Sequence, residues 1–126
     1  MKVLVIGKGA REYALGYTLS RSPAVTSVYF APGNGATGVF FKNINARENE
    51  FELIGEFIEE ENIDLVVVGP EEPIALGIAD YLNQLNSVRR GNCVVIAPSQ
   101  AAAQLEASKA FAKEFATRYN LSLIHI

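Results

Sequence analysis

The chain has 126 residues, a net charge of −3 and 49% hydrophobic residues, values typical of one globular domain that buries about two-thirds of its unfolded surface. Its 11 basic and 14 acidic residues do not form the basic stripe of a nucleic-acid surface, and no apolar run approaches the roughly 20 residues of a membrane-spanning helix. Cys93 is the only cysteine and His125 the only histidine, which argues against a disulfide framework, a thiolate metal site or a histidine-based triad and favours a cytoplasmic protein.

The first stretch of the chain predicts a strand, a glycine turn and a helix. Val3–Ile6 is an unbroken apolar run rich in β-branched residues, typical of a strand covered on both faces. The run stops at Gly7-Lys8-Gly9, and a helical pattern begins at Ala10. Because the start of a helix presents free N–H groups and the positive end of its dipole, we expect an anion to bind there. Arg11 and Glu12 would then provide selectivity.

The glycine turn does not match a dinucleotide-binding fingerprint. Its spacing follows G-x-G-x-x-G only at Gly7 and Gly9, because Glu12 stands where a small residue normally lets helix and strand approach. The next expected strand, Val25–Phe30, also lacks the acidic residue that would hold a ribose hydroxyl. Both tests disfavour a nicotinamide or flavin cofactor. A simple tight turn at the two glycines is the remaining structural alternative.

A second glycine-rich loop follows the second strand. Ala31–Gly38 contains Gly33 and Asn34, residue types that suit positive φ angles and exposed backbone amides. The composition fits a second anion- or hydroxyl-binding loop as well as it fits a plain connector. Val39–Ile44 is expected to form a short edge strand.

The second half of the chain repeats the strand–helix pattern. An amphipathic helix from Glu50 ends at Asn62, and Phe51, Leu53, Ile54, Phe57 and Ile58 form its apolar face. A buried strand at Ile63–Val68 runs into Gly69-Pro70-Glu71-Glu72-Pro73 and a helix to Leu85. A polar link at Ser87–Gly91 leads to a last strand, Asn92–Ala97, and Ser99 is placed to cap a following helix.

Glu71 and Glu72 have two interpretations. Acidic residues at a helix start interact favourably with its dipole, which makes capping the simple reading. The same turn is expected at the sheet edge that carries Gly7–Glu12, where a carboxylate could accept hydrogen bonds from sugar hydroxyls.

Strand–helix units with short connections predict a three-layer α/β domain with a mostly parallel sheet. Ligands of such sheets bind outside the carboxyl ends of the strands, and all the loops singled out above fall on that edge. The sequence therefore predicts one shared pocket there.

Four ordered blocks resemble a known family: GKGAREYAL at Gly7–Leu15, APGNGAT at Ala31–Thr37, VVVGPEEPIALGIAD at Val66–Asp80 and APSQAAAQLEASKAFAKEF at Ala97–Phe115. Together they look like the amino-terminal domain of the phosphoribosylamine–glycine ligases, the glycinamide ribonucleotide synthetases of purine biosynthesis, which are ATP-grasp enzymes. The resemblance extends from Met1 to about Asn120.

The resemblance implies a Rossmann-like, pre-ATP-grasp domain and the ATP-dependent joining of glycine to 5-phosphoribosylamine through a glycyl phosphate, with Mg²⁺ on the nucleotide. The partners would be small molecules only, with no nucleic acid and no membrane. Lys109 would face the ATP phosphates, and Glu71 would accept from ribose hydroxyls. Carried onto this sequence, the substrate-binding residues would be Gly7, Gly9, Ala10, Arg11, Glu12, Gly33, Asn34, Pro70 and Glu71.

The chain departs from the family pattern at several points. Tyr13 stands where the family usually has histidine, a change expected beside the phosphate, and Ala97 and Ala107 stand where it commonly has glycine. The family would continue into an ATP-grasp domain, whereas this chain ends in LSLIHI. We expect residues 1–98 to form the phosphoribosyl-substrate domain, 99–120 a helical lead-in to the missing ATP-grasp domain, and 121–126 a truncated or non-native end.

We therefore expect a ligase fragment that cannot complete the ligation alone. The alternative from another class is a non-catalytic module that binds a nucleotide or sugar phosphate. An oxidoreductase is disfavoured by Glu12, and a response-regulator-like domain would need clustered acids where Gly7-Lys8-Gly9 stands.

Overall fold

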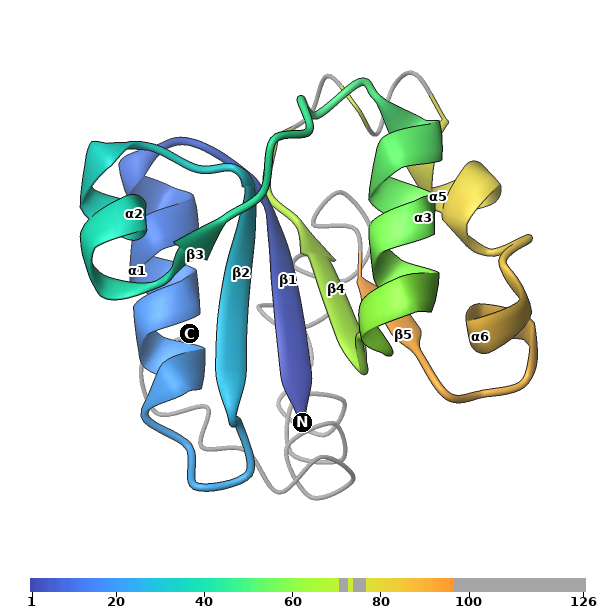
Figure 1. Cartoon of the computed structure of the whole chain (residues 1–126), viewed down its shortest axis with the longest axis horizontal. Helices are drawn as coiled ribbons and strands as arrows, with labels where there is room; N and C mark the ends of the chain where they lie inside the picture. Colours follow the sequence, from blue (N-terminus) through green and yellow to red (C-terminus); the bar gives the residue numbers. More distant parts are fainter. Residues whose placement is uncertain (71–72, 74–76, 97–126) are drawn as a thin grey trace, which may run out of the picture.

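The computed structural model describes residues 1–70, 73 and 77–96, and within them the chain forms one five-stranded, all-parallel sheet of order β3-β2-β1-β4-β5 (Figure 1). This confirms the predicted α/β class and parallel sheet. The strands are β1 Lys2–Gly7, β2 Ser27–Pro32, β3 Lys42–Asn43, β4 Leu65–Val68 and β5 Val94–Ile96.

The predicted helices at 11–21 and 50–61 are present as α1 and α3, and two short helices appear where the sequence predicted loops. Asn34 caps α2 inside the predicted loop 31–38, and α6 occupies part of the predicted link 87–91. Helices this short give no periodic pattern, which is why sequence reasoning missed them. The helices are α1 Ala10–Ser20, α2 Gly35–Phe40, α3 Phe51–Glu61, α5 Ile78–Leu82 and α6 Asn86–Arg89.

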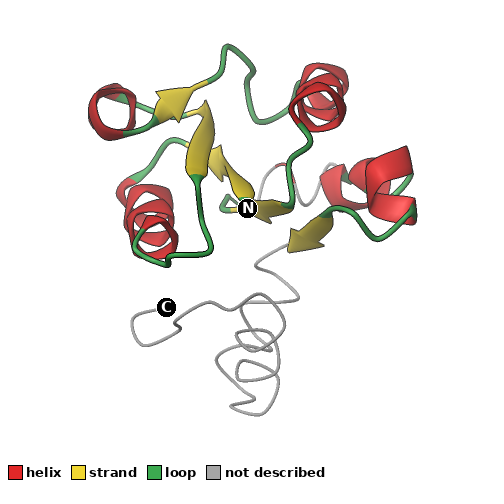
Figure 2. Ribbon diagram, turned by 60° about the horizontal axis from the view of Figure 1, so that its bottom comes forward, coloured by secondary structure: helices red, strands yellow, loops and turns green. Residues whose placement is uncertain are grey.

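Helices cover both faces of the sheet, as predicted for three layers (Figure 2). Alternate residues of β1 point to opposite faces. Val3 and Val5 join the cluster that contains Leu19 of α1, whereas Leu4 and Ile6 join the cluster built with α3 and α5. These four side chains are fully buried. The unbroken apolar run 3–6 is therefore accounted for by a core on each side of the sheet.

Two sequence predictions need correction in this core. The sequence pattern predicts Leu53 on the apolar face of α3, but the residue is 45% exposed, and Ile54 and Ile58 are buried. The edge strand expected at 39–44 is only the two residues of β3, because Val39 and Phe40 belong to the end of α2. The end of α3 is as predicted, with Asn62 in the left-handed conformation at φ 55°.

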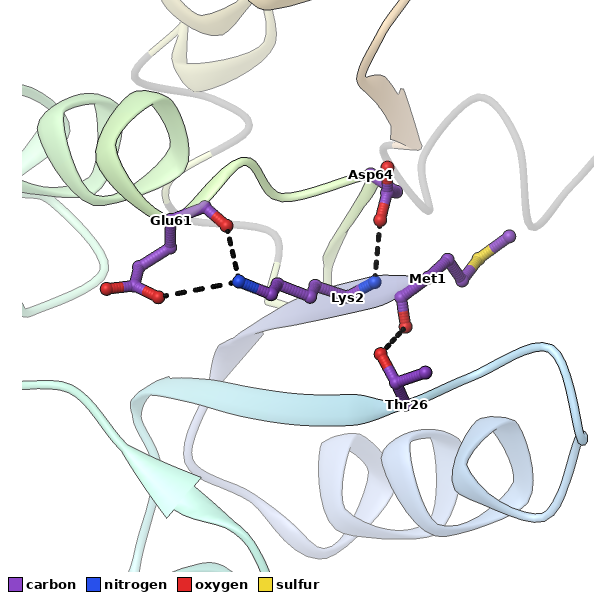
Figure 3. Close-up of polar contacts among 5 residues, drawn as sticks. All are labelled: Met1, Lys2, Thr26, Glu61 and Asp64. Carbon is purple, nitrogen blue, oxygen red and sulfur yellow. Dashed lines mark hydrogen bonds and ion pairs between the residues drawn. The ribbon is translucent and has the colours of Figure 1, made fainter.

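The amino ends of β1, β2 and β4 are tied together by polar contacts (Figure 3). The Lys2 backbone N–H donates to Asp64 Oδ2 at 2.7 Å, and its ammonium donates to the Glu61 carbonyl at 3.0 Å. On the other side, Thr26 Oγ1 donates to the Met1 carbonyl at 3.1 Å. These contacts hold the starts of the three strands together at the amino edge of the sheet.

Candidate functional site

The turns that follow β1, β2 and β4 meet at the carboxyl edge of the sheet, at the top of Figure 1. Gly7 and Pro32 are register partners, and the Gly33 N–H donates to the Gly7 carbonyl at 3.0 Å. On the other side of β1, the Gly69 N–H donates to the Ile6 carbonyl at 2.9 Å. The expected convergence of these loops on one rim is therefore present in the described residues.

Asn34 joins the two glycine-rich turns directly. Its amide Nδ2 donates to the Lys8 carbonyl at 2.6 Å, while its Oδ1 accepts from the Thr37 N–H at 3.0 Å and caps α2. Gly33, with φ at 74°, leads into this cap. A Cβ at position 33 would lie 2.1 Å from Asn43 Oδ1, so the close approach there requires glycine. The first and second loops consequently form one connected unit.

Glu12 occupies the space between the ends of β1 and β4. Its side chain is 8% exposed, and its Oε1 accepts from the Gly9 N–H at 3.3 Å. A Cβ at Gly7 or at Gly69 would lie 2.4 or 2.3 Å from Glu12 Cγ. The helix can thus approach the strand despite a glutamate at the third fingerprint position, because the small residues are Gly7 at the end of β1 and Gly69 directly after β4.

The position of Glu12 coincides with the point where the strand order changes direction. The connection after β1 leads to β2 on one side, and the connection after β3 leads to β4 on the other. Ligands of open α/β sheets bind at this crevice. The Glu12 side chain is thereby placed at the crevice, where Gly7 at the end of β1 and Gly69 after β4 leave room for it.

The other predicted site residues are distributed along the same rim. Ala10 and Arg11 are exposed in the first turn of α1, and within the described part of the chain no hydrogen bond or ion pair engages the Arg11 guanidinium. Pro70 is half-buried just after β4. Glu71, Glu72 and Lys109 lie outside the described residues.

A cavity of about 390 Å³ opens on this rim, and sequence reasoning missed one of its walls. The volume falls in the range of small-molecule pockets, roughly 300–1,000 Å³. One wall comes from the turn after β1, the end of β2 and Pro73, which lies beyond β4. The other wall is the connection between β3 and α3. The lining residues are Lys8, Pro32, Pro73, Asn45, Arg47, Glu48 and Asn49. The sequence feature that could have indicated this wall is the largely polar run 45–50, directly after the predicted edge strand. The loop that follows a parallel strand lies at the ligand-binding edge of the sheet.

Tyr13 belongs to an aromatic group beside the site. Its ring stacks on Tyr17 with centroids 6.3 Å apart and meets Phe40 and Phe41 edge-on at 6.5 and 6.1 Å. It is not among the residues that line the cavity. The described contacts therefore give Tyr13 a packing role between α1 and α2.

The buried thiol of Cys93 is not part of this site. Burial raises the pKa of Cys93 to about 12, and the charges of Asp64 and Glu59 add to the effect. The residue precedes β5 at the amino edge, away from the glycine turns. Its thiol therefore stays protonated near neutral pH and is a core group.

Across residues 1–70, 73 and 77–96, no three His, Cys, Asp or Glu side chains gather as ligands for a metal ion. Among the helices that the structure describes, none combines the length and apolar character needed to cross a bilayer.

Comparison with known proteins assigns the family. Residues 1–106 match the family model described as phosphoribosylglycinamide synthetase, N domain. Similar proteins include the phosphoribosylamine–glycine ligases of Neisseria meningitidis serogroup B, Ralstonia nicotianae and Chlorobaculum tepidum, which are 45%, 44% and 41% identical over 96% of this chain. The chain spans 27–28% of the length of these relatives. Both the family model and the relatives cover the glycine turns described above, and the chain therefore belongs to the phosphoribosylglycinamide synthetase family, as its N domain.

Proposed function

We propose that this chain is the substrate-presenting part of a phosphoribosylamine–glycine ligase. In that role it binds the phosphoribosyl group of 5-phosphoribosylamine, so that glycine can be joined to the amine with ATP to give glycinamide ribonucleotide. The family match supports this proposal, and the observation that carries it is the connected pair of loops at the carboxyl rim, joined by the Asn34–Lys8 hydrogen bond.

Different residues of the rim suit different parts of the ligand. Gly9, Ala10 and Arg11 lie at the start of α1, where backbone N–H groups and an exposed guanidinium suit an anion. Glu12 presents a carboxylate at the crevice, a group that accepts hydrogen bonds from sugar hydroxyls. Gly7, Gly33, Asn34 and Pro70 shape the turns around it, and Glu71 and Lys109 belong to the proposal from sequence alone.

ATP with Mg²⁺ would activate the glycine carboxylate, and we assign their binding to a part of the ligase that this chain does not include. We therefore expect the 126-residue chain alone to form no glycinamide ribonucleotide from 5-phosphoribosylamine, glycine and ATP. The proposal includes a cytoplasmic location and small-molecule substrates.

Titration calorimetry of the 126-residue chain tests the proposal. Glycinamide ribonucleotide should bind, and NAD should not. Arg11→Ala should weaken the binding, whereas Arg21→Ala, which removes an exposed cation at the other end of α1, should leave it unchanged. Tight NAD binding without affinity for glycinamide ribonucleotide would remove the ligase proposal. Binding of ATP alone would favour the alternative, a nucleotide-binding module.

A further inference from the structure

Two cationic side chains from different loops line the cavity on the carboxyl rim. Lys8 comes from the turn after β1, and Arg47 comes from the connection between β3 and α3. The Arg47 loop belongs to none of the glycine motifs, and the proposed function above gives it no part. This wall of the cavity therefore has no assigned role in binding.

Both residues are held by fixed backbone. The Arg47 N–H donates to Glu50 Oε1 at 2.9 Å, and the Glu50 N–H donates back to the Arg47 carbonyl at 3.0 Å, which closes a turn directly before α3. The Ile44 N–H anchors the start of this loop to the Phe30 carbonyl of β2 at 2.8 Å. The Lys8 carbonyl is held by Asn34. The two cations therefore extend from turns whose positions the sheet determines.

The charges of the cavity suit a sugar monophosphate. Within the described part of the chain, neither Lys8 nor Arg47 forms an ion pair, so both charges are available to a ligand. Glu48 is the one acid among the described lining residues, and Asn45 and Asn49 add amide groups. Guanidinium and ammonium groups bind phosphate, whereas a carboxylate and amides bind hydroxyls. Among the described lining residues, two positive charges stand against one negative, a balance that suits a single phosphate.

We propose that Arg47, together with Lys8, binds the phosphate of the phosphoribosyl group, with Glu48 and the two asparagines facing the sugar. This inference rests on the proposed function and adds a specificity residue to it. It assigns the phosphate to side chains from two loops rather than to the start of α1 alone. The cavity then distinguishes ribose 5-phosphate from ribose through Arg47.

The test compares ribose 5-phosphate with ribose as ligands of the 126-residue chain, by NMR titration. We expect the unchanged chain to bind ribose 5-phosphate more tightly than ribose. Arg47→Gln should weaken ribose 5-phosphate binding about ten-fold, which corresponds to about 1.4 kcal/mol. It should not alter the response to ribose, and Arg47→Lys should recover part of the loss. Arg21→Gln is the matched control, an exposed arginine outside the cavity, and should have no effect.

Salt adds an independent readout. Because exposed charges are screened, raising the ionic strength should weaken ribose 5-phosphate binding more in the unchanged chain than in Arg47→Gln. If ribose 5-phosphate binds and Arg47→Gln binds it equally well, the assignment of Arg47 is wrong and the proposed function stands. If the unchanged chain binds neither ribose 5-phosphate nor glycinamide ribonucleotide, the proposed function and this inference fail together.

Discussion

The fit of Glu12 between two glycines leads to a double-mutant prediction. Alanine at position 69 would place its Cβ 2.3 Å from Glu12 Cγ, 2.7 Å from Glu12 Cδ and 3.0 Å from the Ile6 carbonyl oxygen. Overpacking of a well-filled core costs typically about 1–3 kcal/mol. The Ile6 oxygen belongs to the central strand and cannot move freely, so we expect Gly69→Ala to lower the free energy of unfolding by about 2–3 kcal/mol.

Removing the Glu12 side chain should relieve most of this clash. Glu12→Ala alone loses the hydrogen bond from the Gly9 N–H, worth about 1 kcal/mol, together with some packing. In the Gly69→Ala background, the same change also deletes the two atoms closest to the new Cβ. The double variant should therefore be more stable than the sum of the single effects predicts, by about 1–2 kcal/mol, within the range seen for residues in contact.

Urea unfolding followed by far-UV circular dichroism measures all four free energies. Gly35→Ala provides the control, because a Cβ at position 35 meets nothing within 4 Å. Its effect should add to that of Glu12→Ala within about 0.5 kcal/mol. If Gly69→Ala and Glu12→Ala are also additive, Glu12 does not pack between the ends of β1 and β4, and the account of the crevice is refuted.

Three further changes probe the loops, the core and the surface. Asn34→Ala should destabilise the chain by about 1 kcal/mol, because the cap of α2 is lost. Asn34→Asp should restore the cap but not the donor to the Lys8 carbonyl. Equal urea midpoints for the two variants would contradict the capping role of Asn34. The raised pKa of Cys93 means that the unfolded thiol, with a pKa near 9.0, loses its proton before the folded one does. Folding stability should therefore fall as the pH rises above about 9, by up to about 1.4 kcal/mol per pH unit, and this dependence should flatten in Cys93→Ala; an unchanged slope would exclude the thiol as its source. The ion pair between Lys2 and Glu61 joins side chains that are 38% and 44% exposed, so Glu61→Gln should change the unfolding free energy by less than about 1 kcal/mol, and a larger loss would show that the pair is not merely a surface contact.

The sheet and its ligand edge could be predicted from the sequence, because a short unbroken apolar run is stable in few structures other than a strand buried inside a parallel sheet. Residues 3–6 and 65–68 are apolar at every position, and each run is buried in the structure as a strand of the parallel sheet. Once these strands are parallel, their carboxyl ends must share an edge, so the meeting of the turns at Gly7 and Gly69 follows.

The contacts that build the site join residues far apart in the chain. The local sequence pattern around each residue therefore does not predict these contacts. The sequence showed that Glu12 breaks a fingerprint, but not that Gly69 makes room for it from another strand. It singled out Asn34 as a loop residue, but its amide is used on the Lys8 carbonyl 26 positions away. Arg47 belongs to no motif and became a candidate only when the sheet placed its loop beside Lys8.

The central place of β1 has a consequence for how the protein is made. β1 lies between β2 and β4 (Figure 1), and its contact with Asp64 spans 62 positions of sequence. During translation β1 leaves the ribosome before β4, so one edge of β1 stays open until β4 has also emerged. Exposed strand edges promote association between chains, and long-range pairing is slow to form. A nascent chain that stalls before Val68 should consequently be prone to aggregation and a target for chaperones.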